Sequence, residues 1–326
     1  MSFKKFLLIT IILLFTTNCS NDSQELSIDY EKYTLANGLK VILHKDSSDP
    51  LVAISTIVHV GSNREKPGKT GFAHFFEHMA FTASENTPRG ANRLLIPTWG
   101  GSRNGGTSFD YTIYYEVVPK DALEKLMWID SDRLGFMINT VDAETLEGEI
   151  QVVKNEKRQR VDNQPYGHSS GIIQKALYPQ GHPYSWTVIG ELEDLQAATI
   201  EDVKEFYNEF YGPSNATVVI AGDIDFDETK QLVERWFGEI KPNENIIEKP
   251  EVRLVTLSET KKLYHLDKYA QLPQLSLTFP SVEQYSKDSY ALNTLGEILS
   301  DGRNSVFYKE IIEKQKLAPA ANAYNY

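Results

Sequence analysis

Residues 71–81, GFAHFFEHMAF, place three ionisable side chains inside a run that is otherwise apolar and rich in aromatic residues. No proline or glycine interrupts residues 72–83, so a helix is expected, and a helix that is apolar nearly all round is a buried one. Residues three and four apart share a helix face, so His74, Glu77 and His78 project to one side. Burying ionisable groups without partners is costly, so the fold must bring partners to this face.

A divalent metal is one such partner. Two neutral histidines at positions i and i+4 of a helix suit a tetrahedral zinc ion, with Zn–N distances of about 2.0 to 2.1 Å. Glu77 directly precedes His78, which gives the order H-x-x-E-H and places a carboxylate beside the open position of the metal. The alternative is a core helix in which the two histidines meet main-chain carbonyls and the glutamate meets an arginine. The three groups together on one aromatic helix favour the metal site.

A third protein ligand is expected from residues 142–160. Seven residues make almost two turns of a helix, so Glu149 and Glu156 lie on one stripe of this segment. One glutamate would bind the metal, and the other would hold a ligating histidine in position without binding the metal itself. The residues alone do not rank the two, and such a charged segment is also typical of a solvated helix face.

The remaining pattern predicts an α+β fold, with mixed or antiparallel sheets packed against helices. Strands occur in groups and helices in blocks, without the strict alternation of a doubly wound parallel sheet. The expected strands are residues 38–46 and 51–62, interpreted as a β-hairpin, 106–118 and 215–224; the expected helices are 121–138, 142–160, one beginning at Thr199, and 227–240.

Two related subdomains are expected on either side of a linker. Residues 241–251 are acidic and flanked by proline, which is typical of a domain boundary. We therefore expect a zinc-binding catalytic subdomain over residues 30–245. Residues 246–326 would form a second, inactive-type subdomain that begins the same strand-then-helix order again and is incomplete.

The N-terminus indicates export. Two lysines precede an apolar run over residues 6–15, which is too short for the roughly 20 residues that span a bilayer and matches a secretory signal. Cys19, the only cysteine, ends this segment as in a bacterial lipobox, although Asn18 is larger than the usual small residue. We expect residues 1–19 to be a signal peptide with a lipobox, and Cys19 to carry a lipid that anchors the chain to the periplasmic or outer face of a bacterial membrane. Residues 20–29 would be a tether; the alternative is plain secretion.

Charge argues against nucleic acid as a partner. The chain has 33 basic and 45 acidic residues, a net charge of -12, and no long basic cluster that could follow a phosphate backbone.

Several ordered motifs resemble the pitrilysin/insulinase family of inverted zinc metallopeptidases, and the chain is similar to bacterial processing-peptidase-like proteins. They include residues 71–81, NGGTSFDYTIYY at 104–115, the 142–160 segment and DGRNSVFYKEI at 301–311. The resemblance extends over nearly all of residues 30–326. It implies the catalytic half of a zinc metalloendopeptidase that hydrolyses peptide bonds in unfolded peptides or small proteins. The family also contains structural members, so a non-catalytic peptide-binding or structural partner subunit is the alternative.

The resemblance also assigns roles that the residues alone left open. It implies that His74, His78 and Glu156 bind one Zn²⁺ per chain, that Glu77 is the general base for a zinc-activated water, and that Glu149 supports the ligands from behind. Asn104 and Gly105 match positions that bond to the main chain of a peptide substrate added as a strand, although Gly105 replaces the usual alanine. An ordinary internal strand is the alternative there.

One feature of the family is missing from the matching positions. A related half without the zinc motif supplies an arginine and a tyrosine seven residues apart, which stabilise the transition state. The corresponding residues of this chain are Ile312 and Pro319. We therefore expect either a longer protein or a separate zinc-less subunit that supplies the Arg and Tyr. His59, His168 and His182 lack the helical spacing of a metal pair and are expected to be structural or loop histidines.

Overall fold

The computed structural model describes residues 27–243 and 255–326. The signal peptide, Cys19, most of the tether and most of the linker lie outside the described residues. Among the residues that are described, no helix has the length and apolar character needed to cross a membrane.

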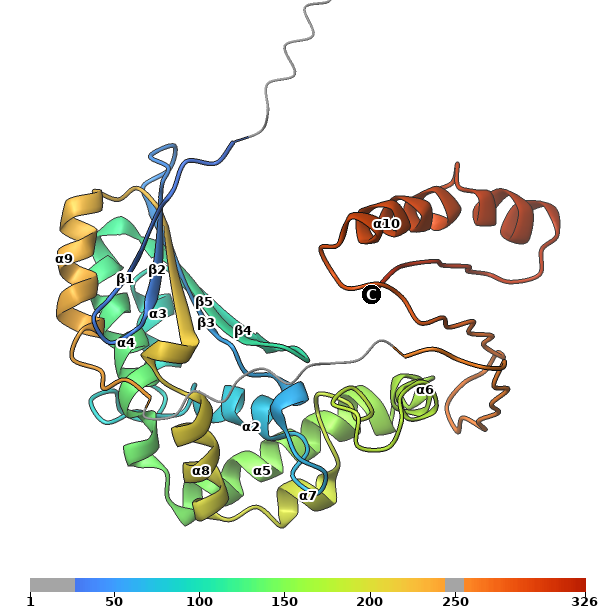
Figure 1. Ribbon diagram of the computed structural model, residues 1–326, viewed down its shortest axis with the longest axis horizontal. Coiled ribbons are helices and arrows are strands. Elements are labelled where there is room, and N and C mark those ends of the chain that lie inside the picture. The colour runs from blue at the N-terminus through green and yellow to red at the C-terminus, as the bar shows by residue number, and fades with distance from the viewer. Residues whose placement is uncertain (1–26, 244–254) are drawn as a thin grey trace, which may run out of the picture.

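The core of the molecule is one six-stranded sheet with the order β1-β2-β6-β3-β5-β4 (Figure 1). β6 runs parallel to β2, and all other neighbours are antiparallel. The strands are β1 Glu31–Thr34, β2 Lys40–Lys45, β3 Leu51–Val58, β4 Ser102–Thr107, β5 Thr112–Pro119 and β6 Ala216–Gly222. The mixed sheet and its helices confirm the expected α+β class.

The predicted hairpin between the second and third strands is wrong. β2 and β3 do not pair, because β6 lies between them and bonds to both. β6 is an apolar strand whose first three residues are buried, and such a strand is most stable in the middle of a sheet. Residues 46–50 therefore cross over the end of one intervening strand, a step of about 10 Å, instead of forming a tight turn.

The single strand expected over residues 106–118 is two strands. β4 and β5 form an antiparallel hairpin in which Thr107 pairs with Thr112, and residues 108–111 make the turn. β4 thereby becomes an edge strand of the sheet. No strand of the described residues pairs with its outer main-chain groups, which is the arrangement that strand addition requires.

Helices of the N-terminal part pack on the sheet and below one end of it. These are α2 Phe72–Met79, α3 Ala91–Thr98, α4 Leu123–Phe136, α5 Ala143–Lys157, α6 Ser169–Leu177, α7 Leu192–Gln196, α8 Ile200–Phe210 and α9 Phe226–Phe237, with short 3₁₀ helices at Ser62–Arg64, Lys120–Ala122, Met137–Thr140 and Pro213–Asn215 and a π-helix, η4, at Arg158–Asp162. α4 and α9 lie side by side, and α4 contacts β3 and β5. In Figure 1, α2, α5, α7 and α8 gather below the lower end of the sheet.

The face of the sheet that α4 covers holds both apolar and ionic contacts. In β3 every second residue is buried, as expected for a strand with one face on the core. Arg133 of α4 is buried and donates to Glu116 of β5 at 2.9 Å and to Asp130 at 2.5 Å. Buried charges are tolerated when they are paired in this way, so the ionic cluster fixes how α4 sits on the sheet.

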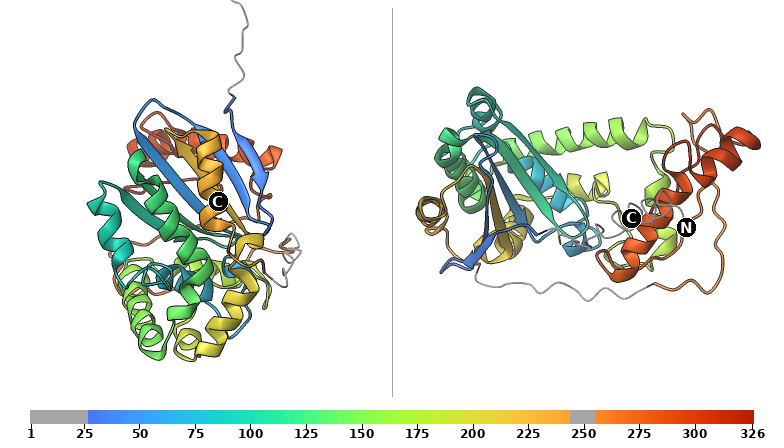
Figure 2. Two further views of the ribbon diagram at one scale, coloured as in Figure 1. Left: turned by 90° about the vertical axis from the view of Figure 1, so that its left-hand side faces the viewer. Right: turned by 90° about the horizontal axis from the view of Figure 1, so that it is seen from above.

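Residues 255–326 contain α10 Lys287–Ser300 and the π-helix η6 Tyr308–Lys314, and no strand among their described residues. Figure 1 shows α10 above α6 and to the right of the sheet, and the view from above in Figure 2 places it at the opposite end of the molecule from α9. This part is joined to the first by hydrogen bonds, for example from Tyr166 to the main chain of Leu272 at 2.7 Å. Among the described residues, no strand lies beside an unpaired segment such as residues 273–280, so residues 255–326 do not form the expected opening strand. The division into two related subdomains stays a prediction.

Candidate metal centre

Helix α2 begins at a position that its own sequence cannot cap. Gly71 is the N-cap residue and has a φ of 84°, and no side chain at this position accepts the free amide groups of the first turn. The buried Glu65 does so instead: its two carboxyl oxygens accept from Gly71 N and Ala73 N, each at 2.9 Å. Residues upstream of the helix therefore define where it starts.

Aromatic packing fixes the rotation of α2 about its axis. Phe72, Phe75, Phe76 and Met79 are buried, and the Phe76 ring stacks on Phe206 of α8 with centroids 4.8 Å apart. With these side chains in the core, the face that carries His74, Glu77 and His78 is left only partly buried. The apolar residues of this run thus form a packed face of the helix, and its three ionisable residues form a separate polar face.

The polar face of α2 meets Glu156 of α5. One donor atom from each of His74, His78 and Glu156 can be chosen so that all three atoms lie within 4.8 Å of one another. Glu156 Oε2 is 2.9 Å from His78 Nε2 and 3.5 Å from His74 Nε2. The structure therefore brings together the three residues predicted to bind the metal. They come from two different helices, and His78 and Glu156 are 78 residues apart in the sequence.

Glu156 is itself held in place. Arg160, one helical turn later, lies 2.8 Å from Glu156 Oε1, which leaves Oε2 directed at the histidines. The contact occurs where α5 passes into η4, and π-helical turns often occur at functional sites. The i, i+4 spacing of Glu156 and Arg160 is visible in the sequence and could have indicated this contact.

The electrostatics of the cluster suit a cation. Burial, followed by the nearby charge of His78, lowers the pKa of His74 to about 4, so its imidazole is neutral at pH 7. Burial also acts to lower the pKa of His78, but the hydrogen bond to Glu156 and the charges of Glu156 and Glu77 outweigh it and raise that pKa. The same hydrogen bond lowers the pKa of Glu156, which stays ionised.

These residues fit a zinc ion and do not match the alternative of an ordinary core helix. Within the described part of the chain, neither histidine ring bonds to a main-chain carbonyl, and His74 Nδ1 is buried without a hydrogen-bond partner. Glu77 contacts a threonine and not an arginine. Two nitrogens and one carboxylate oxygen are the ligand set of a catalytic zinc site whose fourth position is open.

Thr107 is a site residue that sequence reasoning missed. Its hydroxyl, on the edge strand β4, donates to Glu77 Oε2 at 2.7 Å. Burial raises the pKa of Glu77, and the bond from Thr107 acts against that rise. No sequence signal pointed to this contact, because it depends on how the β4–β5 hairpin passes α2.

Glu149 lies on the predicted stripe of α5 and is buried. Arg89 Nη2 lies 3.8 Å from Glu149 Oε1, and burial raises the pKa of Glu149. Among the described residues it forms no hydrogen bond with either histidine. The role of Glu149 behind the ligands stays a prediction.

Asn104 and Gly105 lie on β4, the exposed edge, and not on an internal strand. The structure also explains why Gly105 stands where alanine is usual. A Cβ atom at this position would lie 2.8 Å from the Phe81 ring, which packs against Tyr114 with centroids 5.5 Å apart. Glycine is therefore the residue that lets β4 pass over Phe81.

The three other predicted histidines stay outside the cluster. His59 Nε2 lies 3.0 Å from the Thr217 hydroxyl, between neighbouring strands. The His182 ring stacks on Tyr178 at 4.6 Å, and His168 is 3.8 Å from Asp162. Within the ranges that the structure describes, His74, His78 and Glu156 form the one group of three or more potential ligands.

Comparison with known families gives two adjoining matches. The family described as insulinase (peptidase family M16) matches residues 40–181, which contain α2, β4 and α5. The peptidase M16 inactive domain matches residues 197–326.

Individual proteins agree with this result. The chain is 31% identical to the zinc protease PqqE of Helicobacter pylori, over 99% of this chain and 73% of that protein. It is 27% identical to an uncharacterised zinc protease, YmxG, of Bacillus subtilis, over 90% of this chain and 70% of that one. A crystal structure of a protease from Helicobacter pylori superimposes with a TM-score of 0.80 at 27% identity, over 92% of this chain and 72% of that one. The chain belongs to the insulinase family of peptidases, family M16.

Proposed function

We propose that this chain is the metal-binding catalytic half of a zinc metalloendopeptidase. The observation that carries the proposal is the convergence of His74, His78 and Glu156, with donor atoms within 4.8 Å of one another, beside the partly buried carboxyl group of Glu77. The names of the two relatives, both zinc proteases, support the same chemistry.

His74, His78 and Glu156 would hold the ion. A zinc ion bound there supplies Lewis-acid polarisation and lowers the pKa of a water molecule towards about 7. Glu77 accepts the proton of the attacking water and returns it to the amine of the leaving peptide. Its partly buried position, which raises its pKa, suits a group that must both take and give a proton near neutral pH.

The substrate would be an extended peptide added to the edge of the sheet. β4 carries Asn104 and Gly105, and Thr107 on the same strand touches Glu77. A peptide that pairs with β4 therefore lies beside the general base, and its affinity comes from main-chain hydrogen bonds that any unfolded sequence can make. Unfolded peptides and small proteins are the corresponding substrate class.

The test compares the wild type with Glu77→Gln. We expect both to contain one zinc per chain by elemental analysis, because Glu77 is not a ligand. We expect hydrolysis of an unfolded peptide to be lost, by about 10²-fold to 10⁴-fold, only in the variant. A wild type without stoichiometric zinc, or a variant that cleaves as fast as the wild type, would refute the proposal. Zinc binding without Glu77-dependent cleavage would favour the alternative, a non-catalytic partner subunit.

We also propose that the chain is exported and anchored by a lipid on Cys19. The support is the sequence alone: two lysines, a short apolar run and the single cysteine that ends it. Expression of the full chain in a bacterium with labelled palmitate should give a labelled, membrane-associated protein. Cys19→Ala should remove both the label and the membrane association; retention of both would overturn the proposal.

A further inference from the structure

We propose that residues 189–194, here called the strap, set the separation between helices α2 and α5, and that Lys157 is the positioning residue through which they do so. The inference rests on the proposed zinc site, because α2 supplies the two histidines and α5 supplies Glu156. It concerns residues that bind neither the metal nor the peptide.

On one side, the strap is bonded to the start of α2. The buried Thr70 hydroxyl accepts from Glu191 N at 3.0 Å and donates to Asp194 Oδ2 at 2.6 Å. Thr70 N donates to the same oxygen at 3.0 Å. Three hydrogen bonds thus converge on the residue just before the N-cap of the helix.

The strap and the start of α2 also meet main chain to main chain. Gly190 and Gly71 both have positive φ values, 69° and 84°. A Cβ on Gly190 would lie 2.3 Å from Gly71 N, and a Cβ on Gly71 would lie 2.7 Å from the carbonyl oxygen of Ile189. Because no side chain separates the two segments, a shift of the strap must be transmitted to the first turn of α2.

On its other side, the strap is bonded to the last residue of α5. Lys157 follows Glu156 in sequence, and its ammonium group donates to the carbonyl oxygen of Gly190 at 2.5 Å and lies 3.6 Å from Glu191 Oε2. Only 12% of the Lys157 side chain is exposed, so the ammonium group depends on these partners for its hydrogen bonds. The strap therefore links the two ligand-bearing helices along a route that does not pass through the ligands.

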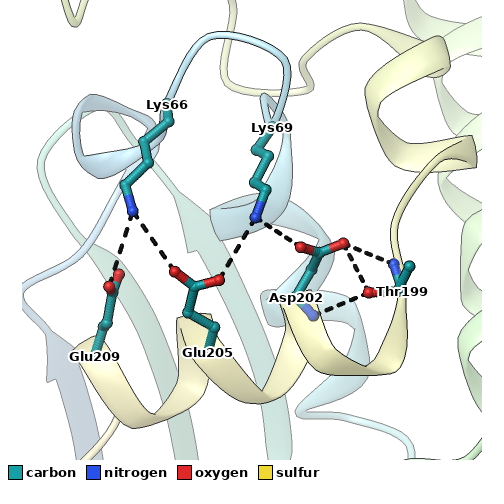
Figure 3. A network of polar contacts seen from close by, with 6 residues as sticks. All are labelled: Lys66, Lys69, Thr199, Asp202, Glu205 and Glu209. Carbon is teal, nitrogen blue, oxygen red and sulfur yellow. Dashed lines mark hydrogen bonds and ion pairs between the residues drawn. The ribbon is translucent and has the colours of Figure 1, made fainter.

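The loop before α2 is also held by exposed ion pairs, in contrast to the hydrogen bonds of the strap. Lys66 and Lys69 form ion pairs with Asp202, Glu205 and Glu209 of α8, which Figure 3 shows from close by. The lysine side chains there are 64% and 42% exposed. Exposed pairs of this kind contribute little, so the bonds of the strap to the buried Thr70 and to the largely buried Lys157 are the contacts expected to control the geometry.

Lys157→Met tests the inference, with Lys175→Met as the matched control. Lys175 also pairs with Glu191, at 2.7 Å, but lies on α6 and does not reach the Gly190 carbonyl. We expect Lys157→Met to raise the zinc dissociation constant about 10-fold to 100-fold, as is usual when a group that supports metal ligands is removed, and Lys175→Met to leave it within about twofold. The measurement is a competition titration of the zinc-free chain with a chelating indicator dye, together with the unfolding midpoint of the zinc-free form.

Thr70→Val loosens the same strap from the α2 side and provides a second variant if Lys157→Met does not fold. It should weaken zinc binding to a similar extent. If the wild type binds zinc and both Lys157→Met and Thr70→Val match Lys175→Met, the strap does not position the ligands and the inference is overturned. If the wild type binds no zinc, the proposed function fails and the inference fails with it. That result is distinct from one in which the wild type binds zinc and the strap variants bind it equally well.

Discussion

At the residue scale, the cluster keeps its two histidines in different states. Burial lowers the pKa of His74 to about 4, so it is neutral at pH 7, whereas His78 Nε2 lies 2.9 Å from Glu156 Oε2 and the pKa of His78 is raised. Metal ligands must be deprotonated, so a metal that binds here displaces a proton from the His78–Glu156 contact. The same contact keeps the side chains together in the protein alone, so the site is organised before any ligand arrives.

Thr107 is expected to orient Glu77, the proposed general base. Thr107→Val removes the hydrogen bond to Glu77, and bonds to charged groups contribute about 1.5 to 3 kcal/mol, so kcat should fall about 10-fold to 100-fold with KM nearly unchanged. Because that bond lowers the pKa of Glu77, the acid limb of the pH–rate profile should move to higher pH. Thr107→Ser keeps the hydroxyl and should stay within a few-fold of the wild type. Equal kinetics of the two variants would contradict this role.

Glu65 is expected to make stability depend on pH. Burial raises its pKa to about 8 in the folded chain, although the amide groups of Ala73 and Gly71 act to lower it. A raised carboxyl pKa means that the folded state holds a proton that the unfolded state has released. The stability of the wild type should therefore fall, relative to that of Glu65→Gln, as pH rises from about 4.5 to 8, by up to about 1.4 kcal/mol per pH unit, and then level off.

The measurement for Glu65 is urea unfolding of both proteins at several pH values. The difference between them isolates Glu65, because other buried acids such as Asp130 titrate in both. A difference that does not change between pH 5 and 8 would show that Glu65 is ionised throughout.

At the scale of secondary-structure elements, the contact between β4 and Phe81, two residues after the end of α2, depends on the absence of a side chain at Gly105. Gly105→Ala would push a methyl group against Phe81, whose ring is held by Tyr114 and lies 4.8 Å from the guanidinium carbon of Arg103. We expect a loss of about 1 to 3 kcal/mol in the free energy of unfolding, as is usual for overpacking.

Gly106→Ala is the matched control for this prediction. The nearest atom to a Cβ at Gly106 is Ile113 Cγ2, at 4.0 Å, so the methyl group has room and stability should change little. The measurement is the thermal unfolding midpoint of the two variants. Equal midpoints would mean that Phe81 moves aside without loss of stability, which would contradict the prediction.

The elements that could be predicted from sequence are those whose signal is local. Helix α2 follows from an uninterrupted aromatic run, and the shared stripe of Glu149 and Glu156 follows from helical periodicity alone. The placement of β6 between β2 and β3 could not be predicted, because the pairing partner lies about 170 residues away in sequence and each strand alone matches several partners. The contact of Thr107 with Glu77 could not be predicted either. It depends on a turn at residues 108–111, within a segment that the sequence pattern predicted to be one strand.

At the scale of the whole molecule, this chain carries the proposed metal ligands but lacks the arginine and tyrosine that the family resemblance expects to stabilise the transition state. Ile312 and Pro319 stand where the resemblance would require arginine and tyrosine; Ile312 lies within η6 and Pro319 follows it. A missing oxyanion donor typically costs about 10² to 10³ in kcat. We therefore propose that a second, zinc-less half or subunit completes the enzyme, and we expect residues 20–326 alone to bind zinc but to cleave peptides slowly. A kcat within about tenfold of the value typical of enzymes, about 10 s⁻¹, for this segment alone would contradict the proposal.

We propose that His74, His78 and Glu156 hold one zinc ion. Anomalous diffraction from crystals of the zinc-loaded chain, recorded on both sides of the zinc absorption edge, tests it most directly. We predict one strong peak, about 2.0 to 2.2 Å from a nitrogen of each histidine and from an oxygen of Glu156, and no such peak for His78→Ala. A peak elsewhere in the chain, or none between these three side chains at full zinc loading, would contradict it.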